Sequence, residues 1–226
     1  MAVFVFAIRS IFDKYFYMKM PKNIWLILIL IITVTVSANY YLRDTSFYLS
    51  GDLSELSEVR QKYLWFTITH FSFAALTLFI GPLQFLPVIR KKFIRLHRSL
   101  GKFYIVGSIL SALTVFVLLA TVYTLPGAIP SLGFLAIIWL YTTVAAYIFI
   151  RKGKIERHKE FMLRSYVCGL AFVFIRLLPE VNDATGIFNF IEDETMRRTV
   201  YEWICWVYPL MIIEFWIVWR KQLMKA

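Results

Sequence analysis

The sequence has 226 residues, of which 60% are apolar, 18% aromatic and 17% charged. A soluble domain is about 45–50% apolar and about 25% charged, and a chain of this length cannot bury so much apolar surface in one soluble core. The composition therefore excludes a soluble enzyme domain, a secreted disulfide scaffold and a disordered chain, and it indicates that the lipid bilayer is the solvent. The net charge of +11 fits either a nucleic-acid partner or basic loops that orient helices in a membrane.

In chain order, six apolar windows are long enough to cross a bilayer core, which takes about 20 residues of helix. They cover residues 23–42, 63–88, 103–125, 131–150, 160–180 and 199–219. None shows the period-two alternation of a membrane β-strand. The sequence therefore predicts an all-α fold, an integral membrane bundle of six transmembrane helices that form a single domain over residues 23–219.

Short segments flank this predicted domain. Residues 1–22 are apolar and aromatic but are interrupted by charged side chains, which favours an amphipathic helix in the membrane plane over a span. The first window ends in Val36-Ser37-Ala38, which is similar to a signal-peptidase site, but the long basic region before it favours an uncleaved anchor. Residues 220–226 form a short basic tail.

The basic and acidic residues of the predicted connections fall on opposite sides of the membrane. Most of the 25 Lys and Arg residues lie before the first window, between the second and third, between the fourth and fifth, and after the sixth. The other connections carry acidic residues, among them Asp44, Glu58, Asp183 and Glu192. Because basic loops stay on the cytoplasmic side, both termini are expected in the cytoplasm, and the net charge is explained without nucleic acid.

The two basic connections inside the chain resemble each other. Residues 90–98 and 151–159 both fit R-K-x-x-I-x-x-H-[RK], with a histidine seven residues after the first arginine. The correspondence continues into the following spans, with one extra residue in the second copy, at these pairs: Tyr104 with Tyr166, and Gly107 with Gly169. Each copy predicts a hairpin, so spans two and three correspond to spans four and five, which indicates an internal duplication. Chance similarity between basic loops is the alternative.

A longer set of residues resembles a known family. It begins at His70 and continues through the stretch Gly81-Pro82-Leu83-Gln84-Phe85-Leu86-Pro87. Its further members are Arg90, Leu96, His97, Arg98, Gly101, Tyr104, His158, Met162, Arg164 and Ser165. Over residues 63–180 these positions resemble the uncharacterised prokaryotic family of predicted membrane proteins called domain of unknown function 2306. Phe161 and Lys102 depart from its pattern, where tryptophan and arginine are expected. The resemblance implies a bacterial cytoplasmic (inner) membrane protein and implies no reaction.

The first candidate site lies at the cytoplasmic ends of the predicted hairpins, where His97 and His158 are expected at the same depth beside cations. Such a cluster predicts an inner site for an anionic or amphipathic head group, such as that of a phospholipid, an isoprenoid phosphate or a quinone. Its residues are His97, Arg98, His158, Arg90, Arg164 and Gln84. One alternative is a haem b with the two histidines as ligands and arginines at its propionates. The other is that these are solvated charges that only set topology.

The second candidate site lies within the spans near the opposite side. His70 is about seven residues into the second window, at a depth where an ionisable side chain is costly and faces the bundle interior. Arg176 and Glu202 are expected at a similar depth on spans five and six. These three residues predict an outer site that binds a ligand or handles protons. A single interhelical hydrogen bond from His70 and a purely structural charge network are the alternatives.

Spans five and six also predict ion pairs. Antiparallel packing places Arg164 with Glu214 near the inner side and Arg176 with Glu202 near the outer side, and pairing would relieve their desolvation. Twelve residues on a straight helix advance by about 120° from whole turns. Only one of the two pairs is therefore expected to face directly. The other partners considered for Arg176 are His70, Glu180 and Asn182.

Motifs for other chemistry are absent from the sequence, which has no P-loop, H-E-x-x-H, C-x-x-C or G-x-S-x-G pattern. Cys168 and Cys205 are interpreted as buried side chains, and no metal site is expected. We predict a multi-pass inner-membrane protein that lies in the lipid bilayer and binds an amphipathic or anionic ligand. The alternatives are a haem-b or quinone-linked redox protein and an accessory or assembly subunit of a larger membrane complex without its own ligand. The pattern does not decide whether the protein is an enzyme.

Overall fold

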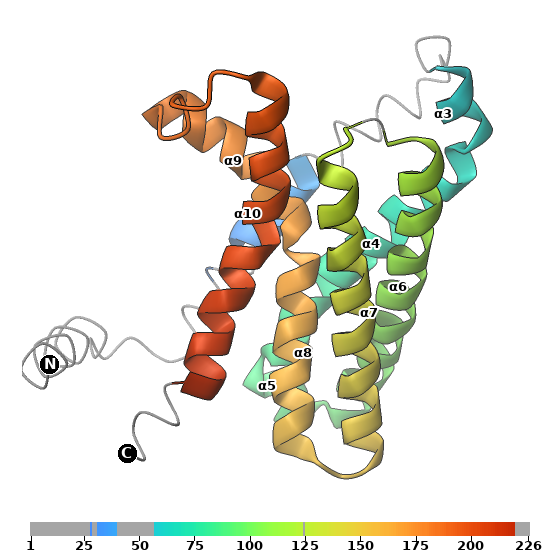
Figure 1. The fold of residues 1–226 in the computed structure, drawn as a ribbon. Helices are drawn as coiled ribbons and strands as arrows, with labels where there is room; N and C mark the ends of the chain where they lie inside the picture. Colours follow the sequence, from blue (N-terminus) through green and yellow to red (C-terminus); the bar gives the residue numbers. More distant parts are fainter. Residues whose placement is uncertain (1–27, 29–30, 40–56, 124, 220–226) are drawn as a thin grey trace, which may run out of the picture.

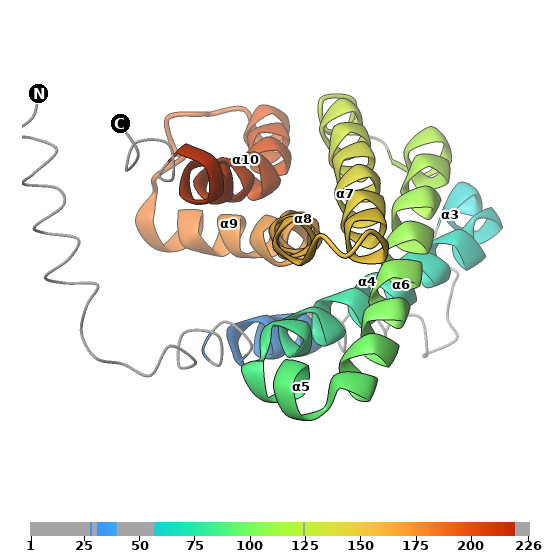
Figure 2. The ribbon, with the colours of Figure 1, turned by 90° about the horizontal axis from the view of Figure 1, so that it is seen from below.

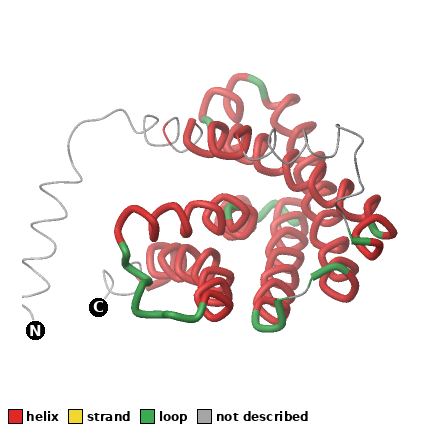
Figure 3. Tube along the Cα trace, turned by 90° about the horizontal axis from the view of Figure 1, so that it is seen from above, coloured by secondary structure: helices red, strands yellow, loops and turns green. Residues whose placement is uncertain are grey.

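A computed structural model describes residues 28, 31–39, 57–123 and 125–219. Within these ranges the secondary structure is helical and contains no strand (Figures 1 and 3), which confirms the all-α prediction. Residues 31–39, inside the first predicted window, are helical. The rest of that window, the predicted in-plane helix within 1–22 and the tail 220–226 lie outside the described residues.

Four described helices are long and apolar enough to cross a membrane. They are α4 (Leu64–Phe85), α6 (Ile94–Thr121), α7 (Ala128–Arg151) and α10 (Glu194–Glu214), which η1 (Phe215–Trp219) extends. A fifth candidate span combines α8 (Ile155–Gly169) with α9 (Ala171–Thr185). The described residues thus contain four or five of the six predicted spans, and the count of six depends on the first window.

The basic connection after α4 is more helical than the sequence predicts. Two short helices, α3 (Glu58–Lys62) and α5 (Pro87–Lys92), flank α4. Helix α6 then begins at Ile94 rather than near residue 103, so that Arg95, Arg98 and Lys102 lie on its first turns. Long basic side chains reach the polar membrane surface from such positions, and an apolar-window criterion therefore misses the start of the helix.

The fifth predicted span, residues 160–180, is bent. Helices α8 and α9 meet at a 45° angle next to Gly169 and Leu170, and Gly186, with a left-handed φ of 67°, ends α9. A Cβ atom on Gly169 would lie 3.6 Å from the Trp139 ring, so α8 still faces α7 at the position of the break. The straight-helix assumption used for the ion pairs is therefore wrong for this span.

The helices pack in an order that keeps each predicted hairpin together. Helix α6 packs against α4 and α7, α8 packs against α7, and α10 lies against α7, α8 and α9. Seen along the helices, α8 lies near the middle, with α9 and α10 on one side and α7 and α6 on the other (Figure 2). The basic end, which we define by α5 and the α7–α8 connection, lies at the bottom of Figure 1.

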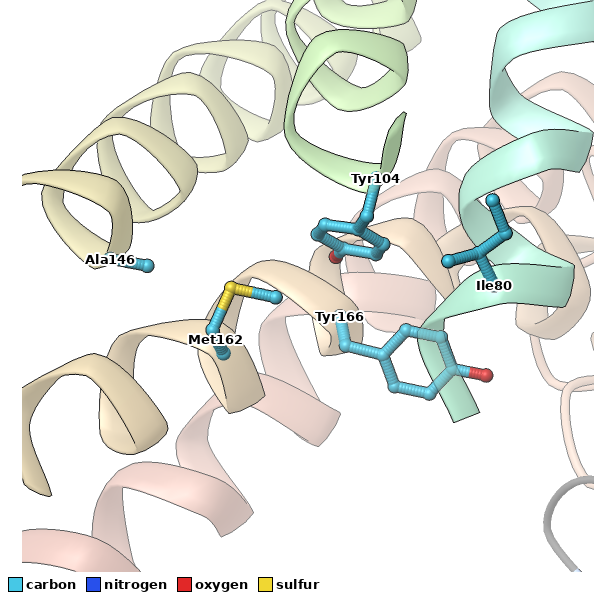
Figure 4. Packing of buried hydrophobic residues seen from close by; sticks show 5 residues of the cluster. All are labelled: Ile80, Tyr104, Ala146, Met162 and Tyr166. Carbon is cyan, nitrogen blue, oxygen red and sulfur yellow. The ribbon is translucent and has the colours of Figure 1, made fainter. Parts of the chain in front are cut away.

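One buried hydrophobic cluster joins α4, α6, α7 and α8. Its buried side chains are Ile80, Tyr104, Ala146, Met162 and Tyr166 (Figure 4). The hydroxyl groups of Tyr104 and Ser165 are 3.0 Å apart, and those of Ser165 and Thr143 are 2.7 Å apart. All three residues are completely buried, so this hydrogen-bonded chain ties α6, α8 and α7 together at one point.

Gly81 of α4 allows the close approach of α8. A Cβ atom at this position would lie 2.3 Å from the Tyr166 ring, a distance that forces the ring to move. The two helices therefore meet without room for a side chain on α4.

We expect Gly81→Ala to lower the Tm of the detergent-purified protein by about 5 °C, because overpacking a core costs about 1–3 kcal/mol. Gly133→Ala on α7 is the matched control, since its added Cβ would have 3.8 Å to the nearest atom, Leu119. Thermal unfolding followed by tryptophan fluorescence measures both variants. Equal Tm values would show that the Gly81 contact is not constraining.

Candidate functional site

A cavity of about 520 Å³, here called the bundle cavity, lies among α4, α6, α7, α8, α9 and α10. Most of its lining is aliphatic or aromatic, with the rings of Phe71, Trp139 and Phe172 among the contributors. Its size is within the range of small-molecule sites, about 300–1,000 Å³. Its polar lining includes His70, Arg176 and Glu202, the three residues that the sequence placed in the outer site. The structure therefore brings them to one cavity from three helices.

His70 on α4 is held by α6. Its Nδ1 lies 3.0 Å from the Ser111 carbonyl oxygen and 3.1 Å from the Ser111 hydroxyl. A carbonyl oxygen only accepts hydrogen bonds, so Nδ1 carries the proton in the neutral ring and Nε2 has the free lone pair. Within the described part of the chain, every hydrogen bond of this imidazole involves Nδ1. Nε2 is therefore the nitrogen left to accept a hydrogen bond in the cavity.

Arg176 on α9 is directed toward its own helix. Its guanidinium carbon lies 3.7 Å from the centre of the Phe172 ring, and its Nη1 donates to the Phe172 carbonyl over 3.3 Å. Stacking on an aromatic face stabilises a cation that has little water around it. The charge nevertheless lies within electrostatic range of both His70 and Glu202.

Glu202 on α10 is buried, with 8% of its surface exposed. The Tyr123 hydroxyl, in the connection between α6 and α7, donates to Glu202 Oε1 over 2.5 Å. Burial, and next the Glu202 carboxylate, raise the pKa of Tyr123, so the phenol keeps its proton and remains a donor. The Glu202 backbone is also held, because its carbonyl accepts from Ser131 of α7 over 2.7 Å.

A second cavity of about 810 Å³, here called the end cavity, lies at the end of the bundle opposite the basic end. Polar residues contribute to its wall, among them Asn182, Asp183, Arg197 and Arg198. The two cavities share five lining residues, namely Arg60, Val122, Tyr123, Ile175 and Glu202. The Tyr123–Glu202 pair therefore stands between the polar end cavity and the mainly apolar bundle cavity.

Sequence reasoning missed Tyr123, Trp139 and both cysteines as cavity residues, although Cys168 and Cys205 line the bundle cavity. Tyr123 falls at the end of a predicted window, where tyrosine is common as an interfacial anchor. Neither its position nor its type distinguishes it from such an anchor. Only the packing of α10 against α7 places Glu202 beside it.

The inner-site residues gather at the basic end, where His97 and His158 are the fourth residues of α6 and α8. The two rings are within electrostatic range of each other. His158 Nδ1 lies 2.9 Å from the Ala146 carbonyl, whereas His97 Nδ1 is buried with no hydrogen-bond partner among the described residues. Gln84 is buried as well, and its Nε2 has no such partner.

Two further cations, Arg90 on α5 and Arg98 on α6, lie within electrostatic range of the His97 ring. Gln84 approaches α6 at Gly101, where an added Cβ atom would lie 3.4 Å from Gln84 Oε1. His97 is one helical turn before Gly101. The structure thus brings His158, Arg90 and Arg98 within electrostatic range of His97, and these four residues are here called the inner cluster.

Arg164, the remaining inner-site residue, has a different partner. Its Nη2 donates to Glu214 Oε2 over 2.9 Å and its Nε donates to Oε1, so the pair is bidentate. This contact confirms the predicted Arg164–Glu214 ion pair between α8 and α10. Arg164 therefore serves to join two helices.

Several membrane-length helices, with ionisable side chains paired or gathered inside the bundle, define a multi-pass helical membrane protein. The comparison with known families agrees. The chain belongs to the family described as "Predicted membrane protein (DUF2306)", whose match covers residues 67–217. This confirms the resemblance and extends it through α10, so that all predicted site residues lie inside the match. No curated protein and no solved structure matches the chain.

We expect Arg164→Gln to destabilise the protein by about 1–3 kcal/mol, because it leaves the Glu214 carboxylate without its charged partner. Arg198→Gln is the matched control, since the Arg198–Glu194 pair is exposed and such pairs contribute about 0–1 kcal/mol. Thermal unfolding of wild type and both variants in the same detergent measures the two losses of stability. A smaller loss for Arg164→Gln than for Arg198→Gln would contradict the structural role of the bidentate pair.

Proposed function

We propose that this membrane protein binds an amphipathic small molecule in the bundle cavity. The observation that carries the proposal is the cavity itself, with a volume of about 520 Å³, a mainly apolar wall, and the polar side chains of Arg60, His70, Arg176 and Glu202 in its lining. A site of this kind favours a ligand with an apolar body and one polar head. A lipid, an isoprenoid or a quinone has this form.

The arrangement of the two cavities supports a direction for the ligand. The bundle cavity meets the polar end cavity at Tyr123 and Glu202, while Trp139 and Cys168 form part of its wall deeper in the bundle. A polar head near Glu202 leaves the apolar body against the aliphatic and aromatic wall. Each part of an amphipathic molecule then meets the surroundings that solvate it best.

The cation-rich inner cluster supports a second candidate function, a redox protein with a bis-histidine haem b at the basic end. His158 Nδ1 bonds to the Ala146 carbonyl, an arrangement that orients the other ring nitrogen toward a ligated metal in many haem and metal proteins. His97 lies within electrostatic range of it, and Arg90 and Arg98 are suitable partners for propionates. A Soret band from protein expressed with ample haem would favour this candidate over the first, and its absence would remove it.

We expect Val115→Trp to displace the ligand, because Val115 lines the bundle cavity and the larger indole takes space that the apolar body of the ligand would occupy. Val106→Trp is the matched control on the same helix, at a position that is 53% exposed and does not line the bundle cavity. The measurement is solvent extraction of each purified protein followed by mass spectrometry of the bound small molecules.

The expected result is a near-stoichiometric amphipathic molecule that is retained by wild type and Val106→Trp and reduced at least about fivefold in Val115→Trp. Equal amounts in both variants would place the molecule on the outer surface. If no molecule is extracted from any of the three proteins, the result contradicts the proposal and favours the alternative of an accessory subunit without its own ligand.

We also propose that the protein lies in a bacterial cytoplasmic membrane with its basic end and both termini in the cytoplasm. The charge distribution supports this orientation, since the α7–α8 connection at the basic end carries Lys152 and Lys154. The end of α9 and the α9–α10 connection, which lie at the opposite end of the bundle (Figure 1), carry Asp183 and Glu192. A membrane-impermeant maleimide should label Glu192→Cys in intact cells and Lys152→Cys only after permeabilisation. Both wild-type cysteines are buried, so their background labelling is low. The reverse labelling pattern would refute the orientation.

A further inference from the structure

One face of α3 and α4, two helices separated only by Tyr63, lines the bundle cavity. Spacings of three and four residues, which are typical of a single helix face, relate the lining residues Arg60, Leu64, Thr67, Phe71 and Ala74. Helix α3 lies at the end of the bundle opposite the basic end (Figure 1). Arg60 therefore stands where this mainly apolar strip begins, and the strip leads from it into the bundle.

Arg60 lines the end cavity as well as the bundle cavity, so it lies where the two cavities meet. Its side chain is exposed, and its guanidinium has no hydrogen-bond or ion-pair partner among the described residues, since only the backbone N–H is bonded, to the Ser57 hydroxyl. The other arginines of the two linings have partners within the protein, which are the Phe172 carbonyl for Arg176, the Ile191 carbonyl for Arg197 and the Glu194 carboxylate for Arg198. The N–H donors of Arg60 are therefore available to a ligand.

The described lining of the bundle cavity has a surplus of positive charge. Its ionised residues are Arg60, Arg176 and Glu202, so that even with a neutral His70 two positive charges stand against one negative charge. Arg176 lies within electrostatic range of Glu202 and offsets its charge, which leaves the charge of Arg60. In the lining of the end cavity, three acidic side chains balance three arginines. An anionic group at Arg60 therefore neutralises the surplus of the bundle cavity, whereas a cation adds to it.

The positions of the charges favour an anionic head at the junction of the cavities over one deep in the bundle. Arg60 is exposed, whereas Glu202 is 8% exposed and its carboxylate accepts from the Tyr123 hydroxyl. A head group that comes from the end cavity therefore meets the guanidinium before the carboxylate. Further along α4, His70 presents Nε2 as an acceptor, which offers an anion no hydrogen bond.

From these observations, and resting on the proposed function of the bundle cavity, we infer that its ligand is an amphiphile with an anionic head. The Arg60 guanidinium holds this head, a carboxylate or a phosphate, where the two cavities meet, because its planar set of donors matches both groups. The apolar chain lies along the strip of Leu64, Phe71 and Ala74. Fatty acids and isoprenoid phosphates share this chemistry.

Four probes with apolar chains of similar length test the head group by isothermal titration calorimetry of the full-length protein in a non-ionic detergent at low ionic strength. They are decanoate, decyl phosphate, decanol and decyltrimethylammonium. Decanol is the matched neutral control. We expect the better of the two anions to bind about fivefold more tightly than decanol, and this preference to fall as salt is added, because the guanidinium is exposed and is screened by salt. The anion that binds more tightly assigns the head as a carboxylate or a phosphate.

Arg60→Gln tests the assigned donor, and Lys62→Gln is the matched control. Lys62 belongs to the same helix, α3, but lines neither cavity. Each variant removes one positive charge, so a general effect of charge would change both proteins equally. We expect Arg60→Gln to lose the preference for the anion over decanol, and Lys62→Gln to keep it. The Tm of both variants should stay close to that of wild type, because the Arg60 guanidinium has no partner among the described residues.

The outcomes separate the inference from the function on which it rests. Decanol binding as tightly as both anions, or tighter binding of decyltrimethylammonium, overturns the anionic head while the bundle cavity remains a ligand site. An anion preference that a folded Arg60→Gln protein retains in full overturns the assignment of Arg60. If no probe binds but Val115→Trp loses the extracted molecule, only the inference is wrong. If no probe binds and the Val115→Trp and Val106→Trp proteins contain the same extracted molecules, the proposed function is wrong as well.

Discussion

The hydrogen-bonded chain of Tyr104, Ser165 and Thr143 is the interaction on which the rest of the bundle depends. In lipid, apolar side chains gain little by leaving one apolar environment for another, so close packing and buried hydrogen bonds hold helices together. This chain joins α6, α8 and α7 at completely buried positions. Below the Tyr104 ring, Tyr166 reaches α4 at Gly81 (Figure 4). The contacts thereby fix the spacing of four helices.

The bundle cavity lies farther from the basic end than this core, and the bend in the fifth candidate span helps to shape it. Helix α8 packs against α7 as far as Gly169, and α9 then turns by 45°. The turn still leaves Arg176 and Phe172 on the cavity wall. Helix α10 contacts both α7 and α9 and brings Glu202 to the same space. The packing of α8 on α7, followed by the bend into α9, thus produces both the tightly packed core and the neighbouring cavity.

Much of the site was predictable as a set of residues, because an ionisable side chain inside an apolar window is expensive and needs an interior partner. That reasoning selected His70, Arg176 and Glu202, and it paired Arg164 with Glu214 correctly. It did not predict the bend at Gly169, since a single glycine in an apolar window is compatible with a continuous helix. It also placed the start of α6 too late, because hydropathy does not register basic side chains that reach the membrane surface.

By itself, the sequence determined that this protein is helical, that it belongs in a membrane and where most of its described spans lie, since these follow from composition and from the length of apolar runs. The tertiary structure alone decided which polar atoms have partners. Tyr123 meets Glu202, and His70 is left with Nε2 as its acceptor, only because α7 packs on α10 and α4 on α6. Hydrogen-bond partners depend on distances of a few tenths of an ångström between helices far apart in the chain, and no local pattern encodes them.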